Sequence, residues 1–349
     1  MNAPLVSVVI PAYNHGPYIR EAVQSVLQQS LSDLELIIVD DGSTDDTLEQ
    51  IHQVADPRVQ VIAQSNQGAH AAINRGLSLA RGNYLAILNS DDRYTPDRLE
   101  RLVPILERDP EIGLVSSYIR VIDAQGISMG IKHGYRDLEP WPLMVPEQSF
   151  RAGHDLRAAL LTENFLATTS NYIFPRTRYQ EVGPFRPLRY THDWDFALRV
   201  ARVADLHLEP APLLDYRVHS SNTIRQDRAA MIFEICWCLA VHLPSHLRDL
   251  GHPRTPPAQV TRLLHSIYTF ETEPLLAVMM LLELASRPEL ASSLLEPENE
   301  MRRRMLEYIQ ARLEHQTHRR SAHHMPGWHH HLLSRLRDRL SLLFARDRS

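Results

Sequence analysis

Cysteine and lysine are scarce in this 349-residue chain. It has two cysteines, Cys236 and Cys238, one residue apart in an apolar stretch, and a single lysine, Lys132. That cysteine spacing does not suit a disulfide on a helix or a strand, so we expect a reducing compartment. Positive charge is carried almost wholly by arginine, and the net charge is −5. Overall basicity therefore gives no indication of a nucleic-acid partner.

Long hydrophobic runs and phosphate-binding glycine loops are also missing. No segment approaches the roughly 18 apolar residues of a membrane span. The chain reaches VSVVI within a few residues and shows no basic segment before it, so we expect no secretory signal and a cytoplasmic protein. The glycines follow neither a Walker pattern nor G-x-G-x-x-G, which disfavours an NTPase or a dinucleotide enzyme.

The first part of the chain alternates short apolar segments with amphipathic ones. Strands are expected in segments 6–13, 34–45, 59–64 and 84–88, and helices over residues 17–30 and 68–80. This alternation predicts an α/β fold with a mostly parallel, Rossmann-like sheet that has helices on both faces. In such sheets, ligands bind beyond the carboxyl ends of the strands.

Two acidic pairs fall at such strand ends. Asp40 and Asp41 follow the second expected strand, and Asp91 and Asp92 follow the fourth. Acids in loops usually cap helices, but capping leaves one carboxylate of each pair without a helix to serve. Adjacent carboxylates raise each other's cost of ionisation. A divalent cation shared with a nucleotide diphosphate would compensate for that repulsion.

Four segments in series resemble the inverting family 2 glycosyltransferases of the GT-A fold. They are VSVVIPAYN (6–14), LELIIVDDGSTDDT (34–47), NQGAHAAINRGLSLARGNYLAILNSDD (66–92) and THDWDFALR (191–199). The resemblance covers roughly residues 5 to 220. It implies a nucleotide-sugar donor, a Mn²⁺ or Mg²⁺ ion, and transfer of the sugar to an acceptor hydroxyl with inversion at the anomeric carbon.

The resemblance assigns donor-binding roles residue by residue. Pro11, Ala12 and Tyr13 would line the nucleotide pocket, and Asp41 would hydrogen-bond the base. Gly68 would let the backbone approach the nucleotide closely.

LNSDD occupies the position of the family's metal motif. Asp91 would face the ribose or the metal, and Asp92 is expected to be the direct metal ligand. Asn89 stands where many family members carry the first acid. Because an amide both donates and accepts hydrogen bonds, Asn89 suits donor binding more than metal ligation.

The base and the closing segment follow from the later motifs. Asp193 corresponds to the family's general base, although His192 stands where the family often has an acid. Capping of the following helix is the alternative role for Asp193. YRVHSSNTI (216–224) resembles the segment that closes the family's active site, so Arg217 and His219 are candidates for diphosphate or metal contact. A structural role is the alternative for both.

The C-terminal part changes character. We expect a catalytic domain over residues 1–226 and a helical domain over residues 227–349, ending in a basic amphipathic helix at 326–349. Such a helix can bind an anionic membrane. Docking on the body of the protein or on a second subunit, as in a homo-oligomer, is the alternative.

The sequence therefore predicts a cytoplasmic glycosyltransferase, peripheral at the inner face of the membrane, that builds a cell-surface or secreted glycan. Its acceptor would be a glycan or a lipid-linked molecule. Two alternative functions are consistent with some of these features. One is a non-catalytic protein that binds nucleotide sugars or serves assembly. The other is a nucleotidyltransferase, which should show a glycine-rich basic loop where this chain has PAYNHGPY.

Overall fold

The computed structural model describes residues 3–132, 156, 160, 164–220, 227–250, 280, 284 and 287–320. The chain divides into two compact units, residues 1–306 and residues 307–349. The expected amphipathic helix at 326–349 lies outside the described residues, and the expected domain boundary after residue 226 stays a prediction. Among the described helices, none combines the length and the apolar character needed to cross a membrane.

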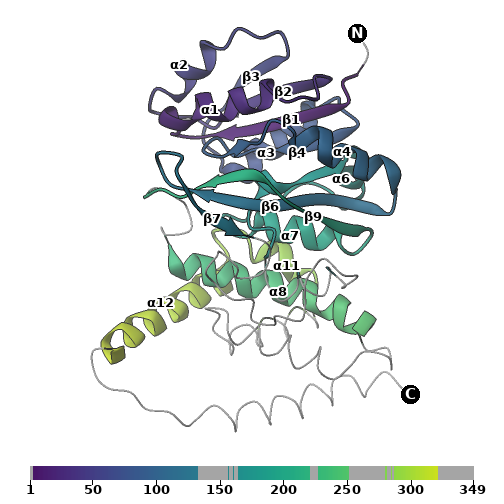
Figure 1. The fold of residues 1–349 in the computed structure, drawn as a ribbon. Helices are drawn as coiled ribbons and strands as arrows, with labels where there is room; N and C mark the ends of the chain where they lie inside the picture. The colour runs from purple at the N-terminus through teal and green to yellow at the C-terminus, as the bar shows by residue number, and fades with distance from the viewer. Residues whose placement is uncertain are drawn as a thin grey trace. The chain divides into compact units, whose positions relative to one another are not determined.

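The first half of the fold alternates strands and helices as the sequence predicts (Figure 1). Its elements are β1 (Val6–Ala12), α1 (Gly16–Leu27), β2 (Leu34–Asp40), α2 (Thr47–His52), β3 (Val59–Ala63), α3 (Ala69–Leu79) and β4 (Tyr84–Ile87). Strands β1 and β2 are buried along their whole length, as is typical of parallel strands covered on both faces.

The second half is less regular. Its elements are β5 (Arg93–Tyr94), α4 (Arg98–Arg108), β6 (Ile112–Ile122), β7 (Ser128–Lys132), a 3₁₀ turn (Thr169–Asn171), β8 (Ile173–Pro175), α6 (Arg176–Val182), α7 (His192–Val200) and β9 (Asp205–Arg217). Three further helices follow, α8 (Arg228–Leu250), α11 (Leu290–Ser293) and α12 (Glu300–Arg320).

All the strands belong to one nine-stranded sheet in the order β3-β2-β1-β4-β8-β6-β9-β5, with β7 paired to β6. The first four strands in that order are parallel. Strand β8 is antiparallel to both β4 and β6, whereas β9 is parallel to β6. The α/β fold is therefore confirmed, with a parallel half that matches the expectation and a mixed half beside it.

The core lies on both faces of the parallel half. Val8 and Ile10 of β1 belong to one buried cluster with Ile19 and other residues of α1. On the opposite face α3 approaches so closely that a Cβ at Gly76 would lie 2.3 Å from Cγ1 of Val9. Because β1 is held from both sides, the loop that follows it starts from a fixed point.

Candidate active site

The loops after β1 and β2 are tied together at the carboxyl edge of the sheet. The backbone N–H of Asn14 donates to Ser43 Oγ at 3.0 Å, and Asn14 Oδ1 accepts from the N–H of Thr44 at 2.7 Å. Of the three residues expected to line the nucleotide pocket, Pro11 and Ala12 end the buried strand β1. Tyr13 stands in the loop with 44% of its surface exposed, which leaves its ring open to a ligand.

Asp41 organises the next part of this edge. Its Oδ1 accepts from the side chain of Gln64 at 2.8 Å and from the N–H of Gln67 at 2.9 Å, and its Oδ2 accepts from the N–H of Gly68 at 2.8 Å. Gly68 adopts φ +89°, a backbone conformation that favours glycine. The structure thus brings Asp41 and Gly68 into direct contact. Their expected roles toward the nucleotide stay predictions.

Asp91 faces two histidines. Its Oδ2 lies 3.0 Å from Nε2 of His219 and 4.0 Å from Nε2 of His15. One ligand atom from each of the three residues falls within 4.8 Å of the other two. Burial alone would raise the pKa of Asp91, but the hydrogen bond with His219 and the charges of both histidines outweigh it and lower that pKa.

This cluster has the chemistry of a cation site. A carboxylate oxygen and imidazole nitrogens are ligands for Mn²⁺ and related ions. Ligands about 2.1 Å from one ion lie at most about 4.2 Å apart, and Oδ2 of Asp91 lies within that distance of Nε2 of both histidines. The cation would take the place of the proton on Nε2 of His219. The described residues therefore fit a divalent cation at Asp91.

Asp92 is engaged elsewhere. Its Oδ2 accepts from Ser170 Oγ at 2.5 Å and its Oδ1 accepts from the N–H of Arg217 at 2.9 Å. Burial and the charge of Asp91 raise its pKa well above the ordinary value. These contacts connect the turn after β4 to the end of β9. Direct metal ligation by Asp92 stays a prediction, whereas the histidine contacts favour Asp91.

Asn89 also holds this turn. Its N–H donates to Ser170 Oγ at 2.9 Å, its side-chain nitrogen donates to Thr168 Oγ1 at 3.0 Å, and its Oδ1 accepts from Thr169 Oγ1 at 3.0 Å. The amide therefore uses both of its functions against residues 168–170. Its donor-binding role is a prediction that these contacts do not test.

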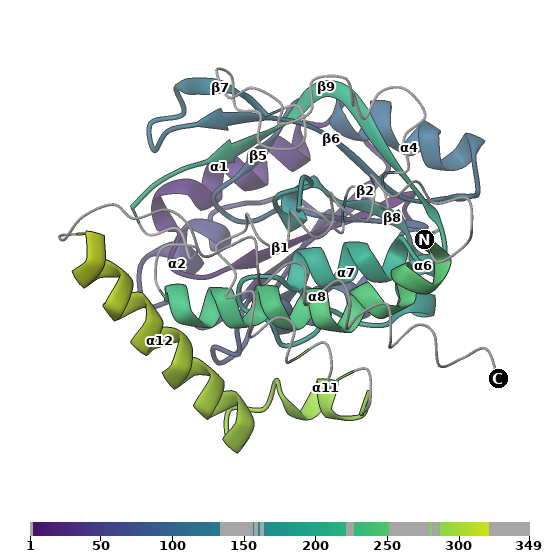
Figure 2. The ribbon, with the colours of Figure 1, turned by 90° about the horizontal axis from the view of Figure 1, so that it is seen from below.

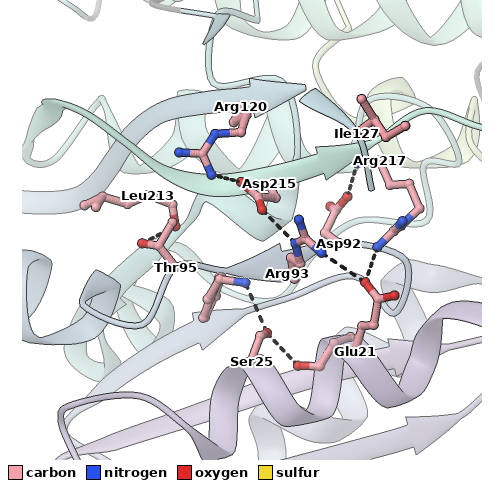
Figure 3. Close-up of polar contacts among 12 residues, drawn as sticks. Glu21, Ser25, Asp92, Arg93, Thr95, Arg120, Ile127, Leu213, Asp215 and Arg217 are labelled. Carbon is pink, nitrogen blue, oxygen red and sulfur yellow. Dashed lines mark hydrogen bonds and ion pairs between the residues drawn. The ribbon is translucent and has the colours of Figure 1, made fainter. Parts of the chain in front are cut away.

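Arg217 is buried, with 1% of its surface exposed. Its Nε donates to the carbonyl of Asp91 at 2.8 Å, and one terminal nitrogen donates to Glu21 at 2.7 Å. Figure 3 shows Glu21 between Arg217 and Arg93, with Arg93 in turn bonded to Asp215. The guanidinium thus supports the turn after β4 that carries Asp91 and Asp92, here called the acidic turn. Contact of Arg217 with a diphosphate remains a prediction.

Asp193 is the second residue of α7, and it is not the cap because Thr191 occupies that position. Its Oδ2 accepts from the side chain of Asn164 at 2.8 Å, and it is 6% exposed. Burial raises the pKa of Asp193, although the charge of His192 and the hydrogen bond from Asn164 act against that rise. A raised pKa makes a carboxylate a stronger base near neutral pH.

Tyr216 of β9 is affected electrostatically by Asp193 and by both acids of the turn after β4. Burial and then the charges of Asp92, Asp91 and Asp193 raise the pKa of this tyrosine. All three carboxylates therefore act on one side chain of β9. Asp91 and Asp193, which the sequence places 102 residues apart, thus both affect the pKa of Tyr216.

Sequence reasoning missed three contributors to this site. His15 follows the first motif directly, and its place one residue after Asn14 was the available signal. Ser170 and Asn164, which bind Asp92 and Asp193, carry no pattern that marks them.

Comparison with known proteins identifies the family of this chain. Residues 7–165 match the family model described as glycosyl transferase family 2. A glycosyltransferase of Haemophilus influenzae is 30% identical over 227 residues, covering 64% of this chain and 68% of the relative. Chondroitin synthase of Escherichia coli is 40% identical over 194 residues, covering 52% of this chain. The matched part spans only 27% of that synthase.

A solved structure shows the same fold. It is S. aureus TarS 1–349 in complex with UDP, with a TM-score of 0.56 and 17% sequence identity, covering 88% of this chain and 87% of TarS. The mixed sheet described above is accordingly that of a GT-A glycosyltransferase. With its family-model match and a relative covered over two thirds of its length, this chain belongs to glycosyl transferase family 2.

Proposed function

We propose that this protein is an inverting, metal-dependent glycosyltransferase that moves a sugar from a nucleotide-diphosphate donor to an acceptor hydroxyl. The observation that carries the proposal is the cluster of His15, Asp91 and His219, and both Asp91 and Asp193 raise the pKa of Tyr216. A cation that stabilises the leaving diphosphate and a carboxylate that takes the acceptor's proton together support displacement at a sugar carbon.

The donor would bind along the loops after β1 and β2. The exposed ring of Tyr13 offers a surface for the base. Asp41 can accept from a base N–H, because its Oδ2 has one described hydrogen bond, from Gly68, and a carboxylate oxygen accepts two. TarS binds UDP, and its fold likeness supports a nucleotide at this edge.

The cation, Mn²⁺ or Mg²⁺, would be held by Asp91 and His219, with His15 as a third ligand. When bound, such an ion stabilises the negative charge that develops on the leaving diphosphate. Asp92 would keep the Asp91 turn in place through Ser170 and the N–H of Arg217.

Asp193 would act as the general base. It takes the proton of the acceptor hydroxyl while that oxygen forms a bond to the anomeric carbon and the bond to the leaving phosphate oxygen breaks. The nucleoside diphosphate leaves with the bonding electrons, and the configuration at the anomeric carbon inverts. The hydrogen bond from Asn164 fixes the orientation of the base.

The biological setting follows from the relatives. Similarity to chondroitin synthase supports a role in building a cell-surface or secreted glycan, with a glycan or a lipid-linked acceptor. We place the activity in the cytoplasm, peripheral at the inner face of the membrane, with residues 1–226 as the catalytic domain. Association with anionic lipid through 326–349, or assembly into a homo-oligomer, would be functions of the C-terminal region.

A panel of nucleotide sugars tests the proposal. The purified protein with Mn²⁺ is incubated with each donor and a set of hydroxyl acceptors, and release of nucleoside diphosphate is measured. We expect one donor class to react, EDTA to stop the reaction, and NMR of the product to show an inverted anomeric centre. Donor binding without transfer to any acceptor would instead identify a non-catalytic nucleotide-sugar-binding protein.

A further inference from the structure

Helix α8 begins after the last segment of sequence resemblance and outside residues 7–165, which match the family model. No motif of the sequence assigns this helix a role in the reaction. Figures 1 and 2 both show α8 running alongside α7, the helix that carries Asp193. Two polar side chains of α8 reach α7 and the turn before it.

The first is Glu234, which is 4% exposed. Its Oε1 accepts from the N–H of Arg189 at 2.8 Å, and its Oε2 accepts from the N–H groups of Tyr190 and Thr191 at 2.7 and 3.1 Å. Three consecutive backbone donors pointing at one carboxylate form an anion-binding nest. The charge also lies near the N-terminus of α7, where the helix dipole favours it.

This nest matters because α7 is not capped by its own N-cap residue. Thr191 precedes the helix, yet its side chain makes no capping hydrogen bond. Asp193 lies two residues after Thr191. The backbone that Glu234 holds therefore sets the direction of the Asp193 side chain. The carboxylate of α8 thus takes over the anchoring that a cap would provide.

The second side chain is His242, two turns further along α8 and 2% exposed. Its Nε2 lies 2.9 Å from Oδ1 of Asp195, which also pairs with Arg186 and Arg199. Asp195 can only accept, because these cations and His242 keep it ionised, so His242 donates from Nε2. Contacts from α8 therefore flank Asp193, at residues 189–191 and at Asp195.

We propose that helix α8 positions the base, with Glu234 holding the turn before α7 and His242 holding Asp195 so that Asp193 keeps one orientation. The kinetic part of this inference rests on the proposed function. The structural part does not. Glu234 and His242 are positioning residues, since they act on Asp193 through residues 189–191 and Asp195.

The test compares Glu234→Gln with Glu107→Gln, the same change on the exposed side of α4. In Glu234→Gln the side-chain NH₂ group would face backbone N–H donors and could not accept from them. We therefore expect faster hydrogen exchange in a peptide covering residues 186–195. Turnover at saturating donor should fall about 10- to 100-fold, the loss that misplacement of about 1 Å produces. Binding of UDP with Mn²⁺ should stay within about twofold of wild type.

A second pair keeps the test decisive if Glu234→Gln does not fold. His242→Gln retains a donor for Asp195 and should keep most of the turnover, whereas His242→Leu removes it and should lose turnover with UDP and Mn²⁺ binding retained. Equal turnover in the two His242 variants would overturn the inference.

The exchange experiment separates this inference from the proposed function. Unchanged exchange at residues 186–195 in Glu234→Gln would overturn the role of α8 whatever the activity. Faster exchange in a protein whose wild type transfers no sugar would overturn the proposed function and leave the anchoring by α8 intact.

Discussion

At the residue scale, the adjacent carboxylates Asp91 and Asp92 coexist because their surroundings differ. Asp91 faces His219 and His15, which lower its pKa, whereas Asp92 is buried against Ser170 and has a raised pKa. Environments that push two carboxyl pKa values apart are how one site gives two acids different roles. In the proposed cation site Asp91 would be the ionised ligand, and Asp92 connects the turn to Ser170 and Arg217.

Substitutions in the acidic turn test this division. Asp91→Asn should weaken Mn²⁺ binding at least about tenfold, since it removes the charged ligand. Asp92→Asn should lose activity, because an amide nitrogen in place of Oδ2 would remove the acceptor of the Ser170 hydroxyl, and one in place of Oδ1 would face the N–H of Arg217. Asn89→Asp should preserve activity, since the Thr168 hydroxyl can donate to the new oxygen. Electron paramagnetic resonance of Mn²⁺ measures the first effect, and unaltered Mn²⁺ binding by Asp91→Asn would refute the ligand assignment.

The partners of Asp195 lead us to expect that the folded protein loses stability in acid. Burial would raise its pKa, but the hydrogen bond from His242 and the charges of Arg199 and Arg186 lower it to about 2. Its stabilisation is therefore present above the unfolded-state pKa and is lost as pH falls through the folded-state value. His242, whose pKa is lowered by burial, acts in the same direction by resisting protonation below about pH 6.5.

The matched variant is Asp195→Asn. Between about pH 5 and pH 2 the difference in unfolding free energy between wild type and variant should shrink by about 2 kcal/mol. Urea unfolding at a series of pH values measures it. A difference that stays constant over this range would mean that Asp195 is not held ionised by its partners.

The sequence reveals the acids of the site but not their partners. Asp41, Asp91, Asp92 and Asp193 stand in a recognisable order of motifs. The contacts of Asp91 with His219 and of Asp92 with Ser170 join residues 128 and 78 positions apart. Nothing in local spacing encodes such pairs, because they arise from the mixed pairing of distant strands.

At the element scale, the close packing of α3 on β1 explains why a small residue stands at position 76. Gly76→Ala would bring a methyl group within 2.3 Å of Val9. We expect a loss of about 1–3 kcal/mol in unfolding free energy from this overpacking. Denaturant unfolding measures it.

The control for that variant is the double substitution Gly76→Ala with Val9→Ala. Removing the two methyl groups of Val9 makes room, so the double variant should be more stable than the sum of the two single changes indicates. Simple additivity would mean that the helix shifts instead of meeting Val9.

Local pattern predicts the parallel half of the sheet and fails in the mixed half. Strands β1, β2 and β4 are short apolar runs bounded by turns, which is the signal a buried parallel strand gives. Strand β9 carries Pro210 and Pro212 and alternates irregularly in polarity. It becomes a strand through its long pairing with β6, a non-local interaction that sequence spacing does not show.

At the scale of the whole molecule, arginine is concentrated at the C-terminus. Residues 326–349 carry five arginines among leucines at helical spacing, a pattern typical of helices that bind anionic lipid. Deleting 326–349 should reduce co-sedimentation with vesicles that contain phosphatidylserine. Vesicles of phosphatidylcholine alone are the control. Equal binding of both proteins to the anionic vesicles would remove the membrane role and leave docking on this protein or on a second copy.

The central claim is that Asp193 serves as the base in a site whose cation and donor are held by other residues. Its most direct test is Asp193→Asn, with transfer and metal-dependent binding of nucleoside diphosphate measured on the same preparation. We expect transfer to be lost while nucleotide binding in the presence of Mn²⁺ stays close to wild type. Undiminished turnover in Asp193→Asn would contradict it.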